Sequence, residues 1–251
     1  MSSLTQFFPD SRYQFNIPQT FGQLYVYNGN TGGAVQDGGK CCLWVVPTGV
    51  VWAKFELWGA GGDGGGACCC QQPSQGGGSG TYARKTIRVV AGQCYLLCAA
   101  GSGCCAQDAK GTNGFPSFAQ GAGTVTYSLN LCASGGYGGQ SCCWAAIGGN
   151  YHCATNVCGC ACGYDLAICG VTGAAHEGWC GYDTWHMMGS PTYIGAGTRT
   201  SFTTCGESWM GCAMGGNFNA WPGGGGGTAI SYGGCCWGGW GSGGLVQVTY
   251  K

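Results

Sequence analysis

Apolar residues recur at every second position on both sides of a short turn at Pro47-Thr48-Gly49. The alternating positions are Trp44 and Val46 before the turn, and Val51, Ala53, Phe55 and Leu57 after it. A period of two residues is that of a β-strand with one buried face. The pattern therefore predicts a β-hairpin across residues 43–57.

The same alternation predicts further strands at 22–28, 81–90, 94–99, 124–133 and 245–250. A tight turn, Ala91-Gly92-Gln93, stands between 81–90 and 94–99, so these two strands are expected to form a second hairpin. In the last strand Val246, Val248 and Tyr250 share one face, and we expect this strand to pair with residues 51–57. The predicted fold class is all-β.

Glycine runs follow several of these predicted strands, beginning with Trp58-Gly59-Ala60-Gly61-Gly62. Ordering a glycine costs more backbone entropy than ordering any other residue, so such a run does not favour an ordinary strand or helix. The runs are either flexible linkers or extended helices of three residues per turn, packed side by side through their backbones. Because Trp and Cys interrupt the runs instead of Ser, Glu and Lys, packed segments, of the polyglycine II kind, are favoured.

Charged residues make up only 7% of the 251 residues and sum to zero net charge, which gives no electrostatic footprint for nucleic acid or an anionic membrane. The chain has 55 glycines, but its 13% aromatic and 45% apolar content is far above that of disordered chains. We expect a folded protein with no signal peptide, no transmembrane helix and no nucleic-acid partner.

The 22 cysteines admit three roles: small apolar packing residues, disulfides formed after release from a cell, or metal ligands. Many are sequence neighbours, between which disulfides would be strained, so packing is favoured. Candidate metal ligands are His152, His176 and His186 with Cys153, Cys158, Cys160 and Cys162. Their spacing does not favour a zinc site, because Cys158, Cys160 and Cys162 alternate and lack the paired spacing of such sites. We therefore predict no metal and no cofactor.

Residues 1–42 differ from the rest and are interpreted as an N-terminal arm with the first strand, preceding a glycine-rich β-domain at 43–251. The arm's aromatic side chains, which are candidates for docking onto a neighbouring subunit or a larger assembly, are Phe7, Phe8, Tyr13 and Phe15. The alternative is that the arm lies across its own domain.

Residues 141–214 have poor strand periodicity and are interpreted as a long irregular insertion, which is where binding functions are often placed. The candidate ligand-binding aromatics in or beside it are Trp144, Tyr151, Trp179, Tyr182, Trp185, Trp209 and Trp221. Rings of this kind provide contact area for sugars or proteins, although they serve equally well as the insertion's own core. No nucleophile motif, phosphate-binding loop or paired-acid signature occurs, so we predict that the protein is not an enzyme.

Five motifs in order resemble the glycine-rich domain of bacteriophage tail fibres, fibre tips and other virion appendages. They are Trp44-Val45-Val46-Pro47-Thr48-Gly49-Val50, the glycine run 58–66, the strand 80–90 with Gly92-Gln93, Phe115-Pro116-Ser117-Phe118, and the closing strand 244–250. The resemblance covers almost all of the chain after the arm. The high cysteine content of the chain and the insertion at 141–214 depart from the family pattern.

The resemblance implies a β-sandwich with glycine-rich loops, built into a virion and multimeric, with a trimer favoured. Its partners would be other virion proteins, through the arm, and a glycan or protein of the host surface. We predict a structural virion component with a host-attachment role. The alternatives are a secreted or surface glycine-rich structural protein of a cell and, less favoured, a cysteine-based metal-binding protein.

Overall fold

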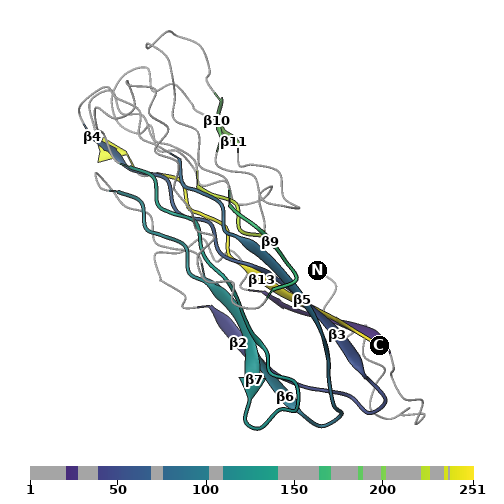
Figure 1. The fold of residues 1–251 in the computed structure, drawn as a ribbon. Coiled ribbons are helices and arrows are strands. Elements are labelled where there is room, and N and C mark those ends of the chain that lie inside the picture. The colour runs from purple at the N-terminus through teal and green to yellow at the C-terminus, as the bar shows by residue number, and fades with distance from the viewer. Residues whose placement is uncertain are drawn as a thin grey trace, which may run out of the picture.

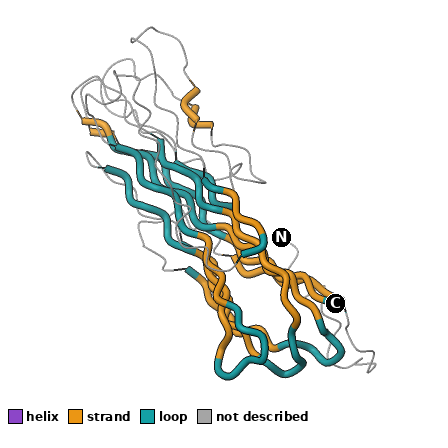
Figure 2. The backbone as a smooth tube through the Cα atoms, viewed as in Figure 1, coloured by secondary structure: helices purple, strands orange, loops and turns teal. Residues whose placement is uncertain are grey.

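The computed structural model describes residues 21–27, 39–68, 76–101, 110–140, 164–170, 186–188, 199–201, 222–226, 235–236 and 238–251. These residues form strands and connecting segments, with no helix among them, which confirms the all-β prediction. The strands of the two larger sheets gather toward one end of an elongated body, and irregular segments continue from them toward the other end, where the short strands β4, β10 and β11 lie (Figures 1 and 2).

One sheet has five antiparallel strands, in the order β1-β13-β3-β5-β9. Their bounds are Gly22–Tyr27 for β1, Leu245–Tyr250 for β13, Trp52–Trp58 for β3, Tyr82–Arg88 for β5 and Leu166–Ile168 for β9. The expected pairing of the closing strand is confirmed, because β13 pairs with β3 along its full length, with Val248 opposite Phe55.

The second sheet has four antiparallel strands, in the order β2-β6-β7-β8. Their bounds are Lys40–Val45 for β2, Cys94–Ala99 for β6, Ser117–Ala122 for β7 and Asn130–Ala133 for β8. Two short pairs complete the described strands: β4 (Ala67–Cys68) with β12 (Cys235–Cys236), and β10 (His186–Met188) with β11 (Arg199–Ser201).

Both sheets contribute to one hydrophobic core. At its centre, the ring centroids of Trp44 and Tyr95 lie 5.8 Å and 5.6 Å, respectively, from that of Phe55. Trp44 and Tyr95 belong to the four-stranded sheet, whereas Phe55 belongs to the five-stranded sheet. Aromatic pairs at such separations add to the stabilisation from buried area, so this cluster holds the two sheets together.

Both predicted hairpins are wrong. The strands β2 and β3 flank the Pro47-Thr48-Gly49 turn, and β5 and β6 flank the Ala91-Gly92-Gln93 turn, yet each pair is divided between the two sheets. Each turn therefore crosses the end of the core instead of reversing the chain within a sheet. Val46 and Val50, on either side of the first turn, are buried at this crossing.

Two other expectations need correction. The strand predicted at 124–133 is confined to β8, and residues 123–129 form the connection from β7. The insertion, predicted to be irregular, contains β9, β10 and β11, of which β9 extends the five-stranded sheet beside β5. These strands are three residues long, too short for alternation to reveal them.

Candidate functional site

Among the described residues, six glycine-rich segments pack side by side, and most of them directly precede or follow a strand. This glycine bundle comprises residues 59–66, 76–80, 110–114, 134–140, 222–226 and 238–244. In Figure 2 the segments run as parallel irregular tubes beyond the strand ends. Residues 59–66, here called the central segment, are all buried and hydrogen-bond to each of the other five segments.

Backbone hydrogen bonds hold the bundle together with a period of three residues. Main-chain N–H groups three positions apart in the central segment donate to the same neighbouring segment or to the residue that directly follows it, at N···O distances from 2.7 to 3.1 Å. The donors and their acceptors are Gly59 and Gly62 to Thr81 and Gly78, Ala60 and Asp63 to Phe115 and Thr112, and Gly61 and Gly64 to Ser242 and Gly239. Successive N–H groups of the central segment thus donate hydrogen bonds to three neighbouring segments, one after another.

The close spacing of the segments explains why they are made of glycine. A Cβ atom placed on Gly61 would overlap the carbonyl oxygen of Gly224, and one placed on Gly62 would overlap that of Tyr137. Neither glycine has a positive φ angle, so the backbone conformation itself does not require glycine there. The requirement is steric: side chains would separate backbones that must touch to bond.

Asp63 is a carboxyl group inside the bundle, with no exposed surface. Its Oδ1 accepts a hydrogen bond of 2.8 Å from the Gly241 N–H, and its Oδ2 accepts one from the Thr112 hydroxyl. Burial raises the pKa of this carboxyl above its usual value, although the bonds from Thr112 and Gly241 act in the opposite direction. Asp63 therefore connects three segments of the bundle through one side chain.

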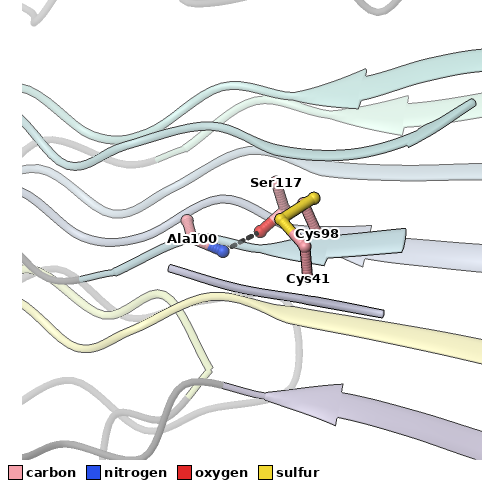
Figure 3. Close-up of a disulfide and its surroundings, with 4 residues drawn as sticks. All are labelled: Cys41, Cys98, Ala100 and Ser117. Atoms are coloured by element: carbon pink, nitrogen blue, oxygen red, sulfur yellow. Dashed lines mark hydrogen bonds between the residues drawn. A yellow bond between two sulfur atoms is a disulfide. The ribbon is translucent and has the colours of Figure 1, made fainter. Parts of the chain in front are cut away.

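A buried serine joins the bundle to the two sheets. The Ser117 hydroxyl, at the start of β7, donates to the Trp58 carbonyl at 2.6 Å and accepts from the Ala100 N–H at 2.9 Å (Figure 3). Trp58 ends β3 and Ala100 follows β6, so both chains are fixed where they leave the strands. The sequence gives no signal for this role beyond the position of Ser117 between Pro116 and Phe118.

The bundle separates two ends of the molecule. At the end where the chain crosses between the sheets, here called the turn end, Phe21 precedes β1 and is 68% exposed. In the bundle, Gly136 donates to Ala60 and Gly139 donates to Asp63, so residues 134–140 run away from the strands in the same direction as the central segment. Gln140 therefore lies at the far end, and the predicted insertion begins at the next residue.

The predicted site residues lie outside the described residues. This holds for the aromatics Trp144, Tyr151, Trp179, Tyr182, Trp185, Trp209 and Trp221, and for Phe7, Phe8, Tyr13 and Phe15 of the arm. The described residues also exclude Cys158, Cys160, Cys162 and His152. Within the described ranges, no group of three His, Cys, Asp or Glu side chains is arranged to hold a metal ion.

The described cysteines include a disulfide between Cys41 and Cys98, which face each other on β2 and β6 (Figure 3). Cys169 is also disulfide-bonded. Cys42 instead packs against the core as a thiol, and burial raises its pKa. Cysteines of one chain thus serve two of the predicted roles, and the Cys41–Cys98 pairing depends on a strand register that spacing does not reveal.

No helix in the described part of the chain is long and apolar enough to cross a membrane. No family model matches the chain, and no curated protein shows significant similarity to it.

Proposed function

We propose that the protein is a β-sandwich in which the glycine segments continue the strands as extended helices of the polyglycine II kind. The core shared by the two sheets supports the first part. The three-residue period of the bonds from the central segment supports the second, because such helices have three residues per turn and no internal hydrogen bonds. Each turn then points one N–H toward each of three neighbours.

Hydrogen exchange tests the proposed packing of glycine segments. Amides of residues 59–64 should exchange as slowly as those of β3, because their N–H groups are bonded and buried. A flexible linker would exchange at the rate of an unstructured peptide. Fast exchange at these six residues together with slow exchange in β3 would contradict packed helices.

We further propose that the protein is a non-enzymatic structural component of a bacteriophage virion: a tail fibre, fibre tip or other appendage subunit. The observation that carries this proposal is the position of Phe21 and Gln140 at opposite ends of the molecule. An assembly arm preceding Phe21 and the part of the insertion that directly follows Gln140 would be held apart by a continuously bonded spacer, whereas β9 of the same insertion returns to the five-stranded sheet. The resemblance to glycine-rich appendage domains supports the same role.

In this proposal the arm binds other virion proteins, and copies of the chain associate as a homo-oligomer. The aromatic residues of the insertion bind a glycan or protein on the host surface. The Cys41–Cys98 disulfide favours a place outside the reducing cytoplasm, which suits a particle released into an oxidising medium.

Antibodies against the two ends test this orientation. One antibody is raised against residues 1–20 and another against residues 141–163, and both are first shown to bind the isolated protein. On purified virions we expect the second antibody to bind and the first to be blocked by the assembly. Binding of the first antibody alone would reverse the orientation.

Mass spectrometry of the same particles tests the role itself. We expect the chain among the virion proteins after density-gradient purification. Its absence from particles, with its presence in the surface fraction of uninfected cells, would favour a cellular structural protein instead.

A further inference from the structure

The outward faces of the two sheets differ in chemistry. Strands alternate their side chains between the core and the outside, so the core residues identify the outward positions. On the five-stranded sheet the outward positions include the charged residues Lys54, Glu56, Arg84 and Arg88. On the four-stranded sheet none of the outward positions of β2, β6, β7 and β8 carries a charged residue.

The uncharged face is also largely apolar. This apolar face is defined by the disulfide Cys41–Cys98 together with Leu43, Val45, Leu96 and Phe118. In the strand register Cys98 stands opposite both Cys41 and Phe118, and Leu43 stands opposite Leu96, so these residues are neighbours on one side of the sheet. Cys98 is buried, whereas Leu96 and Phe118 are half-buried. Leu43 and Val45 are 57% and 52% exposed, respectively, the two largest exposures of aliphatic side chains among the described residues.

The size of the apolar face is that of an interaction surface. The apolar face lies on β2, β6 and β7, and three strands at about 4.8 Å spacing with six residues at about 3.4 Å rise cover roughly 14 by 20 Å. This amounts to about 300 Å² in plan, at the lower end of the range in which the largest exposed apolar patches of monomers are often functional. Ordinary alternation in a solvent-facing sheet would instead place polar residues here.

We propose that copies of this chain associate through the apolar face. Around a twofold or threefold axis, each residue close to the axis meets the same residue of another copy. A charged side chain in that position would oppose a like charge, whereas Leu43, Val45 and Phe118 are self-complementary. Two such sheet faces can pack at about 10 Å, as the sheets of a sandwich do.

The five-stranded sheet is the internal comparison. Its outward face holds a Lys54–Glu56 ion pair, with N···O at 2.6 Å, and the Tyr82 hydroxyl donates to Glu56 at 2.7 Å. Its charged groups would be desolvated or set against like charges in a symmetric contact. Copies of the chain are therefore expected to meet through the four-stranded sheet and not through the charged outward positions of the five-stranded sheet. This inference goes beyond the virion role, since the contact would form equally in a cellular assembly.

Sedimentation of the full chain tests the proposal. We expect an oligomer of two or three copies, and the Leu43→Lys and Val45→Lys variants should each weaken self-association at least about a hundredfold. The matched control is Val51→Lys. Val51 is 50% exposed, but its N–H donates to Lys251 and it lies away from the apolar face, so this variant should associate like the wild type.

A second variant keeps the test valid if the lysine variants lose association only because they misfold. Gln120 stands opposite Leu96 on the same face and is exposed, so Gln120→Glu adds a charge without removing an apolar contact. We expect this variant to fold, by its circular dichroism spectrum, and to lose association.

Several results would overturn the proposal. These are a monomeric wild type up to about 100 µM, equal loss of association in Val51→Lys, and an oligomer that non-reducing electrophoresis shows to be disulfide-linked. Loss of association in an arm variant, Phe7→Lys with Phe8→Lys, while the Leu43→Lys and Val45→Lys variants still associate, would place the contact in the arm instead.

Discussion

The five-stranded and four-stranded sheets, here together called the strand half, are stabilised in the opposite way to the glycine bundle. In the strand half, large side chains such as Phe55 and Tyr95 are fully buried in one core to which both sheets contribute. In the bundle, segments touch backbone to backbone, and a single Cβ would overlap a neighbouring carbonyl. Stability in the first region depends on filling space with side chains, and in the second on excluding them.

The largest effect is expected from one added methyl group in the bundle. Gly62→Ala places a Cβ against the Tyr137 carbonyl, which is backbone and cannot move without breaking its own bond to the Gly78 N–H. We expect a loss of about 4 kcal/mol in the free energy of unfolding, measured by urea denaturation.

The control separates this overlap from backbone strain. Gly123 has a φ of 80°, but a Cβ there would meet no atom within 4 Å. Gly123→Ala should lose only about 1–2 kcal/mol, because the left-handed conformation is unfavourable for alanine. Equal losses at Gly62 and Gly123 would show that the bundle can expand, and that its segments are not in contact.

Removal of side-chain volume from the core should have the next largest effect. Leu97 is fully buried in the core, and Leu97→Ala is expected to lower the free energy of unfolding by about 3 kcal/mol. Val90→Ala removes part of a side chain that is 40% exposed and should cost less than about 0.5 kcal/mol. If Leu97→Ala were as mild as Val90→Ala, the core would not be closely packed.

Asp63 is the exception within the bundle, because it is a side chain on which three segments depend. Asp63→Ala leaves the Gly241 N–H without its acceptor, and we expect a loss of about 2 kcal/mol in the free energy of unfolding.

The same residue predicts a dependence of stability on pH. Because burial raises the folded-state pKa of Asp63 above that of the unfolded chain, the folded protein binds more protons between the two values. Its contribution to stability is therefore greatest below the unfolded pKa, near 3.9, and is lost as pH rises through the folded pKa. Asp63→Asn should lack this loss, so its stability relative to the wild type should increase from pH 4 to pH 7.

Urea midpoints of wild type and Asp63→Asn across that range measure the effect. Parallel curves for wild type and Asp63→Asn would show that the carboxyl is not desolvated in the folded state.

The two regions also differ in how far the sequence predicts them. Alternation located β3, β5, β6 and β13, since each has one face in the core and a period of two follows directly from that. It could not assign strands to sheets. A turn such as Pro47-Thr48-Gly49 has the same local chemistry whether it reverses within a sheet or crosses to another, and only the shared core decides between them.

In the bundle, composition indicated that the glycine segments pack together, but it did not indicate which segments contact one another. Glycine at 61 and 62 shows that side chains are excluded there, but which neighbour excludes them depends on contacts with Gly224 and Tyr137, far along the chain. The structural role of Asp63 has a weak signal, a lone carboxyl in a glycine run. The predicted ligand-binding aromatics and the arm lie outside the described residues, and their roles remain predictions.

The smallest effect is expected at the exposed turn end of the strand half. The Arg88 guanidinium lies 5.9 Å from the ring centroids of both Trp52 and Tyr127, so one side chain joins the two aromatic rings. Cation–π contacts at exposed sites contribute about 0.5–1 kcal/mol, and Arg88→Met should cost about that much while keeping the aliphatic stem. Arg88→Lys should lose less stability than Arg88→Met, because the lysine ammonium retains the positive charge. Some loss should remain, because an ammonium cannot lie flat on a ring as a guanidinium does. Thermal unfolding at low and high salt measures both variants. If Arg88→Met were neutral, side-chain contacts would not extend to the turn end, and the strand half would be stabilised by its core alone.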